Sequence, residues 1–164
     1  MKKIEDVLAD YLYYGCKKLL SKFIKADVNY NKVEDISRED IIKLKNESGI
    51  GGIILDVDGT ILHSQKGVSE EASNWINMIK EELKICVVSN ASEGWIKPTM
   101  DKYNLEYVTF ALKPRKKAFL EAADKMGLEP ENIMVIGDSV VSDIVGAKRV
   151  GMKNVLVKDL NEER

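Results

Sequence analysis

The sequence contains few of the residues from which disulfide frameworks and zinc sites are built. Its 164 residues include two cysteines and one histidine. Cys16 and Cys86 lie far apart and have no cysteine or histidine neighbour at metal-ligand spacing, so we interpret them as free thiols. Any histidine-based mechanism must use His63. We interpret His63 as a surface residue, with a substrate contact as the alternative.

Long apolar runs and a strong charge imbalance are also missing. No stretch approaches the roughly 18 apolar residues that a membrane span needs. Glu5, Asp6 and Asp10 interrupt the apolar core that a signal peptide would require. The net charge of −2 gives no reason to expect a nucleic-acid partner. We therefore expect a cytoplasmic protein, either free or peripheral at the inner face of the membrane.

Apolar segments and amphipathic segments alternate from Gly52 onward. The predicted strands are 52–57, 84–89, 107–110, 133–137 and 154–158. The predicted helices are 70–82, 93–103, 115–126 and 140–149. Near-continuous apolar strands that alternate with helices are typical of a parallel sheet covered on both faces. The sequence therefore predicts an α/β fold with a doubly wound, mainly parallel, Rossmann-like sheet over residues 49–164.

The first 48 residues have a different pattern and form a predicted N-terminal helical extension. Apolar residues recur at helical spacing over 3–24, and lysines gather toward the end of that stretch. This helix could pack on the sheet domain or on a second subunit, which would make a homo-oligomer. Alternatively, residues 3–25 could lie on an anionic membrane surface. A short helix is predicted over 38–46, with Ser37 as its N-cap.

Polar side chains lie at or just beyond the ends of the first four predicted strands, in the order that a catalytic site would need. The strands lead into Asp56 and Asp58, Ser89 and Asn90, Lys113, and Asp138 with Asp143. Ligands bind at the carboxyl ends of the strands of open α/β sheets, so we expect these groups to meet at one edge. Carboxylates crowded together repel one another unless a cation lies among them. Mg²⁺ is the simplest choice, and Mg²⁺ with a lysine favours a phosphate group.

The two-residue spacing of Asp56 and Asp58 then has a chemical reason. Residues i and i+2 of an extended strand point the same way, and the turn at Gly59 lets both carboxylates reach a substrate. One carboxylate can attack phosphorus as a covalent nucleophile. The other can protonate the leaving oxygen and later accept a proton from water. Mg²⁺, Lys113 and Ser89 would meet the charge that develops on the phosphoryl oxygens.

These motifs resemble those of the haloacid dehalogenase (HAD) phosphatases. "DVDGT", "VVSNA", Lys113 and "GDSVVSD" look like the four motifs of that superfamily. The resemblance covers residues 50–158 and implies Asp56 as nucleophile and Asp58 as general acid/base. It implies that Mg²⁺ is held by Asp56, the carbonyl of Asp58 and Asp138, with support from Asp143. The implied phosphate-binding set is Thr60, Ser89, Asn90 and Lys113, with Thr60 also orienting the first loop.

The entry segment "DISREDIIKLKNESGIGGIILDVDGTIL" resembles the YqeG-type HAD phosphatases. That group includes phosphatidylglycerophosphate phosphatases, which implies a lipid headgroup as the substrate. One position departs from the group, which usually has Asn where this chain has Gly59. The intervals 61–88 and 90–112 leave no room for a cap domain. An open site suits phosphates on large partners, namely a lipid, a protein or a nucleic acid, unless a second subunit closes it.

Two other classes compete with this interpretation. A soluble or macromolecular phosphomonoester could replace the lipid as the substrate of a capless phosphatase. A non-catalytic module that binds phosphate and Mg²⁺ is the alternative from a different class. A receiver domain would need its acceptor aspartate after the third strand, and the segment ending near Phe110 offers none.

Overall fold

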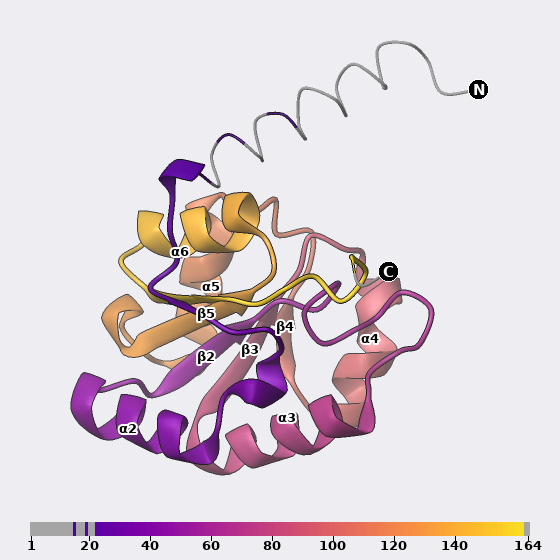
Figure 1. The fold of residues 1–164 in the computed structure, drawn as a ribbon, viewed down its shortest axis with the longest axis horizontal. Coiled ribbons are helices and arrows are strands. Elements are labelled where there is room, and N and C mark those ends of the chain that lie inside the picture. The colour runs from indigo at the N-terminus through magenta and orange to yellow at the C-terminus, as the bar shows by residue number, and fades with distance from the viewer. Residues whose placement is uncertain (1–14, 16–18, 20–21, 163–164) are drawn as a thin grey trace.

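The computed structural model describes Gly15, Leu19 and residues 22–162. Its six strands are Val28–Asn29 (β1), Gly52–Leu55 (β2), Lys84–Val88 (β3), Glu106–Val108 (β4), Ile133–Gly137 (β5) and Lys153–Leu156 (β6). They form one sheet in the order β1-β6-β5-β2-β3-β4, and every neighbouring pair is parallel (Figure 1). This confirms the predicted doubly wound α/β fold. The predicted helix over 3–24 falls mostly outside the described residues.

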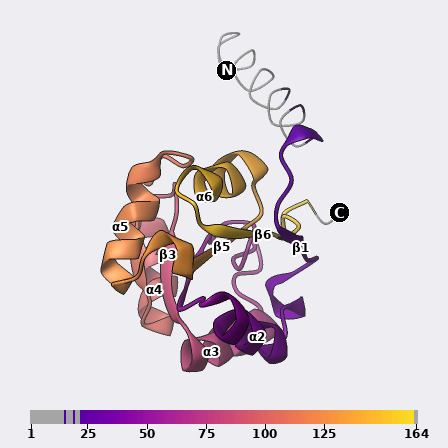
Figure 2. The same ribbon diagram turned by 90° about the vertical axis from the view of Figure 1, so that its left-hand side faces the viewer.

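Helices cover both faces of the sheet. The α-helices are Arg38–Ser48 (α2), Glu70–Glu82 (α3), Glu93–Tyr103 (α4), Lys116–Met126 (α5) and Val145–Arg149 (α6). Short 3₁₀ turns lie at Val33–Asp35 (η1) and Pro130–Asn132 (η2), and a π-helical turn, Val140–Ile144 (η3), leads into α6. Figure 2 shows α2 and α3 on one side of the sheet and α5 and α6 on the other.

The side-chain alternation of β2 builds the two halves of the core. Ile53 and Leu55 pack into the core under α2, α3 and α4, whereas Ile54 packs against α5 and α6. Successive residues of a strand point to opposite faces, so a strand covered on both sides must be apolar throughout. All four residues of β2 are buried. The central strand is therefore rigidly held where it ends at the catalytic motif.

Local sequence signals set the ends of the helices. Ser69 begins α3, and its hydroxyl accepts a hydrogen bond from the Ala72 amide at 3.0 Å. The capping box of α2 pairs Ser37 with Asp40. Gly127 ends α5 with φ +63°, in the left-handed region that glycine adopts at low cost. These caps fix where each loop at the sheet edge begins.

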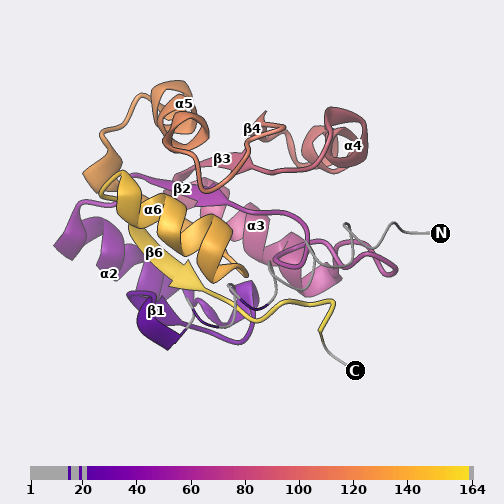
Figure 3. The same cartoon turned by 90° about the horizontal axis from the view of Figure 1, so that it is seen from above.

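The segment before β2 is part of the same core, although the sequence analysis grouped it with the N-terminal extension. β1 pairs with β6 at the edge of the sheet, as Figure 3 shows. Val33, Ile36 and Ile41 are buried in the core shared with α3. A two-residue strand has no alternation to read, which is why the sequence did not predict β1. A boundary at residue 48 thus separates segments that share one core.

Candidate active site

The predicted polar residues meet in one open pocket at the carboxyl ends of β2, β3 and β5. The pocket has a volume of about 210 Å³. Its lining residues are Asp56, Asp58, Ser89, Asn90, Ala91, Lys113, Asp138, Ser139, Ser142 and Asp143. Of the predicted site residues, only Thr60 is absent from this lining. Strand order explains the convergence, because parallel strands present their carboxyl ends at the same edge.

Lys113 forms the centre of the site. Its Nζ lies 2.6 Å from Asp56 Oδ1 and 2.7 Å from Asp143 Oδ1. The lysine side chain is only 3% exposed. Burial acts to lower its pKa, but the attraction of the two carboxylates outweighs burial and raises the pKa above its ordinary value. Lys113 is therefore a fixed cation that neutralises part of the carboxylate charge.

Three carboxylates cluster in the site, and two of them contact this cation. Asp56, Asp138 and Asp143 each present an oxygen, and these oxygens lie within 4.8 Å of one another. Burial, followed by repulsion from Asp56 and Asp143, raises the pKa of Asp138 to about 8. Burial also raises the pKa of Asp143 to about 6, although Lys113 opposes this shift. One buried lysine thus leaves excess negative charge, and an all-oxygen cluster fits a hard divalent cation.

Gly137 and η3 together place the Asp143 carboxylate. A Cβ at Gly137 would lie 2.3 Å from Asp143 Cγ, so only glycine allows this approach. The Ser139 amide donates to Asp143 Oδ2 at 3.1 Å. The wide turn of η3 brings Asp143 back over the end of β5, and π-helical turns are frequent at functional sites.

The other residues predicted to bind phosphate each make a different set of hydrogen bonds in the site. The Ser89 hydroxyl accepts from the Ala91 amide at 3.0 Å, and Asn90 Oδ1 accepts from the Lys113 amide at 2.7 Å. The Thr60 hydroxyl lies 3.2 Å from both Asp56 Oδ2 and Asp138 Oδ1. Its single proton can be donated to either of these two oxygens. Thr60 thus organises two carboxylates in this structure, and its phosphate contact stays a prediction.

Asp58 lies at the edge of the pocket and not within the carboxylate cluster. It is exposed, and its Oδ1 accepts a hydrogen bond from Trp95 Nε1 at 2.8 Å. Its predicted metal contact, through the backbone carbonyl, stays a prediction. The contact with Trp95 could not be predicted from the sequence, because no local pattern links residues 37 positions apart.

Asp159, which follows β6, is a further residue of the site that was not predicted from the sequence. Repulsion from Asp159 contributes to the raised pKa of Asp138. At Gly59, with φ +80°, a Cβ would lie 2.5 Å from Asp159 Oδ1, so this carboxylate fills the space where a side chain would begin. Asp159 directly follows the predicted strand 154–158, and inspection of that strand's end would have found it. The same segment holds the Asp56 loop, because the Leu160 amide donates to the Gly59 carbonyl at 2.8 Å.

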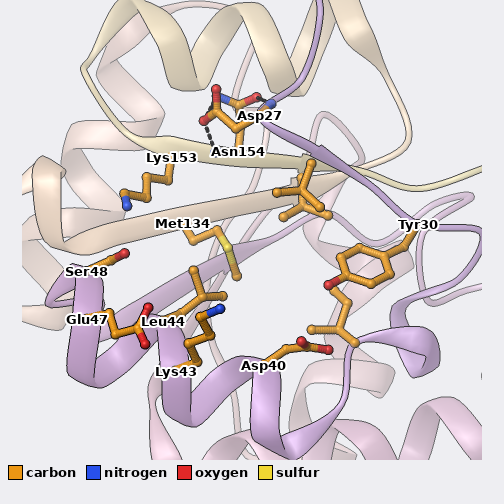
Figure 4. Close-up of a pocket in the computed structure, with 13 residues that line it drawn as sticks. Asp27, Tyr30, Asp40, Lys43, Leu44, Glu47, Ser48, Met134, Lys153 and Asn154 are labelled. Carbon is orange, nitrogen blue, oxygen red and sulfur yellow. Dashed lines mark hydrogen bonds between the residues drawn. The ribbon is translucent and has the colours of Figure 1, made fainter.

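A second hollow of about 330 Å³ lies between α2 and the edge strand β1 with its neighbour β6 (Figure 4). Its apolar lining includes Leu44 and Met134. The two oxygens of Asp27 accept hydrogen bonds from Asn154 and Lys148. Although this hollow is larger, no three acids converge there in the described part of the chain. We therefore assign the chemistry to the pocket at the strand ends.

Comparisons with known proteins agree with this geometry. Residues 53–112 match a family model of haloacid dehalogenase-like hydrolases, and residues 111–161 match a model described as HAD-hydrolase-like. The probable phosphatase YqeG of Bacillus subtilis is 32% identical over 141 residues, which cover 85% of this chain and 80% of that protein. The chain belongs to the haloacid dehalogenase-like hydrolases. It is a phosphatase of this superfamily.

Other relatives match over shorter segments. A phospholysine phosphohistidine inorganic pyrophosphate phosphatase of Xenopus laevis is 48% identical over 46 residues, 28% of this chain and 17% of that protein. A HAD phosphatase structure from Thermococcus onnurineus matches with a TM-score of 0.53 and 25% identity, covering 60% of this chain and 49% of that one. A Yersinia pestis 3-deoxy-D-manno-octulosonate 8-phosphate phosphatase matches with a TM-score of 0.53, 14% identity, and coverage of 68% and 66%. At that identity the likeness shows the fold alone.

Proposed function

We propose that this HAD phosphatase is a Mg²⁺-dependent phosphomonoester hydrolase that acts on phosphatidylglycerophosphate through an aspartyl-phosphate at Asp56. The observation that carries the proposal is the position of Lys113, whose Nζ lies between Asp56 and Asp143 at the floor of an open pocket. A carboxylate beside a fixed cation, in a site suited to a phosphate, is a nucleophile of the aspartyl-phosphate kind.

The acidic cluster would hold the metal. Asp56, Asp138 and Asp143 supply oxygen ligands of the type that Mg²⁺ prefers. The raised pKa of Asp138 marks negative charge that one lysine does not balance. When bound, the cation would neutralise developing charge on the phosphoryl oxygens.

The side chains divide the steps of hydrolysis among them. An oxygen of Asp56 forms a bond to phosphorus as the bond from phosphorus to the substrate oxygen breaks, and Asp58 gives its proton to that oxygen. A water molecule then attacks the phosphorus, returns a proton to Asp58 and releases inorganic phosphate with regeneration of Asp56. Two of the three Lys113 donors contact carboxylates, so the third can donate to a phosphoryl oxygen, as can the Ser89 hydroxyl.

Two features support a lipid substrate. The entry segment resembles the YqeG-type group, and the Bacillus subtilis protein of that name is a relative over most of its length. The segments between Thr60 and Ser89 and between Asn90 and Leu112 each hold one α-helix and one strand of the sheet, so neither segment contains a cap domain. No helix among residues 22–162 is long and apolar enough to cross a bilayer.

A substrate panel tests the proposal. Phosphatidylglycerophosphate in mixed micelles would be compared with sugar phosphates, nucleotides and phosphopeptides, with and without Mg²⁺, and with Asp56→Asn protein as the blank. We expect the highest kcat/KM for the lipid and no turnover in EDTA. A higher kcat/KM for a soluble metabolite would contradict the lipid assignment, and metal-independent turnover would contradict the Mg²⁺ assignment.

A further inference from the structure

Large apolar side chains are exposed around the mouth of the catalytic pocket. Trp95, Phe110 and Leu112 are 51%, 64% and 59% exposed. Trp95 lies in the first turn of α4, and the other two lie on the loop from β4 to α5. Both segments follow the carboxyl end of a strand, which is the edge of the sheet that carries the chemistry.

One side-chain contact, one backbone contact and one peptide link connect these residues to residues that line the pocket. The Trp95 indole donates to Asp58 Oδ1 at 2.8 Å. The Phe110 amide donates to the Ala91 carbonyl at 3.2 Å. Leu112 directly precedes the buried lysine of the site. The three therefore form an apolar rim, which we define as Trp95, Phe110 and Leu112.

The backbone of the loop directs two members of the rim outward. Ala111 is buried, and its amide donates to the Ser89 carbonyl at 3.1 Å. The residues on either side of it have φ values of +47° and +50°, which bulky residues rarely adopt. Strain of this kind persists where the surrounding structure enforces it, often at functional sites. The loop thus holds Phe110 and Leu112 in water at a conformational cost.

Cationic side chains adjoin the rim. Arg115, Lys116 and Lys117 are exposed and follow the loop directly. None of them forms a salt bridge with any residue in 22–162. The two lysines lie in the first turn of α5, which contains no acid, although a helix N-terminus favours negative charge. Two lysines in the first turn are unfavourable for the helix by itself, because they lie at its positive end. The same two charges would attract an anionic partner.

We infer that the apolar rim and these three cations bind the surface of a bilayer that contains anionic phospholipid. Apolar side chains inserted among headgroups, with adjacent basic residues near lipid phosphates, are the two components of interfacial binding. The open pocket lies at the same edge of the sheet and includes Lys113, which is next to Leu112 in the chain. A lipid phosphate would therefore reach Asp56 without leaving the bilayer. The inference rests on the proposed lipid substrate and adds the surface through which the enzyme reaches it.

Vesicle co-sedimentation with the full chain tests the inference. The probes are vesicles of phosphatidylglycerol with phosphatidylcholine, and vesicles of phosphatidylcholine alone. The apolar test variant is Phe110→Ser/Leu112→Ser. Its matched control is Val28→Ser/Ile42→Ser, which alters two exposed apolar residues at the opposite edge of the sheet and on α2.

A second pair of variants tests the charges. Lys116→Glu/Lys117→Glu is matched by Lys43→Glu/Lys153→Glu, which makes the same change in net charge beside the hollow of Figure 4. We expect both rim-side variants to lose about tenfold or more in partition coefficient on anionic vesicles, and both controls to bind like the parent chain. Quenching by brominated lipid should affect Trp95, whereas the other tryptophan, Trp75, is buried.

Activity assays separate this inference from the proposed function. All four variants should hydrolyse p-nitrophenyl phosphate at parental rates, and only the rim-side variants should lose activity on lipid in vesicles. Rim-dependent binding without lipid hydrolysis would support the surface and contradict the substrate. Lipid hydrolysis in micelles with unchanged vesicle binding of the rim-side variants would overturn the surface alone. Loss of phosphopeptide turnover in those variants without vesicles would also overturn it, in favour of a protein-docking surface.

Discussion

Replacement of Lys113 by methionine is the perturbation for which the structure predicts the largest effect on stability. The change keeps most of the side-chain volume and removes the charge. Nζ lies 2.6 Å from Asp56 and 2.7 Å from Asp143, whose side chains are 10% and 2% exposed. Removing one partner of a buried ion pair costs about 3–5 kcal/mol, because the other charge is left unpaired. For a domain of this size, that loss lowers Tm by about 6–20 °C.

The loss of stability should depend on pH, because the carboxylates can take up protons and so lose the negative charge that the missing lysine leaves unpaired. Lys113 lowers the pKa of Asp143 against the effect of burial, so this pKa rises further in the variant. Urea unfolding in EDTA should therefore show a large loss of free energy of unfolding at pH 8 and a smaller loss at pH 5. Turnover of p-nitrophenyl phosphate should also fall about 10²-fold or more.

Two further variants test this reasoning. Lys84→Met removes an exposed lysine whose Nζ donates to the Met126 carbonyl, and it should stay near parental stability. Lys113→Met/Asp143→Asn should recover part of the lost stability, because one of the unpaired carboxylates is gone. A Lys113→Met protein as stable as the parent at pH 8 in EDTA, or a loss equal at both pH values, would refute the electrostatic account.

Further changes in the acidic cluster have separate signatures. Asp56→Asn should reduce turnover by about 10⁴-fold or more while leaving the metal-free protein folded, and parental turnover would rule out the covalent step. Asp58→Asn should nearly abolish turnover with an unchanged circular dichroism spectrum. The pKa values of Asp138 and Asp143 are raised to about 8 and about 6. The two carboxyl groups therefore contribute stability below about pH 4, and this stability is lost as the pH rises through these values. Urea midpoints in EDTA should fall over this pH range, and Mg²⁺ should reduce the fall. Gly59→Asn should lower both Tm and turnover, since its Cβ would meet the carboxylate that follows β6.

Much of the fold was predictable because its pattern is local. The run 133–137 and the helices 70–82 and 93–103 have the boundaries expected from apolar periodicity and caps. The strand predicted over 52–57 ends at Leu55, since the chain turns toward the pocket where the acids begin. The strand at Val28–Asn29 could not be predicted, because its only signal is its pairing with Val155 and Leu156.

The site residues that lie at or just beyond the end of a strand could be predicted from the sequence. Asp56, Lys113 and Asp143 follow strands or lie one turn beyond them, and they meet as expected. The contact between Trp95 and Asp58 was not predictable, because it depends on how the first turn of α4 lies over the pocket. Sequence patterns thus assign residues to an edge of the sheet, and packing decides which of them touch.

The contacts between residues 159–161 and the loop after Asp56 affect the order in which the active site is completed during synthesis. The Leu160 amide bonds to Gly59, and Asn161 Oδ1 accepts from the Ser64 amide, 97 positions earlier in the chain. Synthesis delivers the nucleophile before the residues that make these contacts. A nascent chain that ends at β6 already has every strand of the sheet and both core faces, but its catalytic loop lacks these contacts. Proteolytic cleavage just before Asp159 would likewise remove these contacts from the catalytic loop and leave every strand of the sheet in the chain.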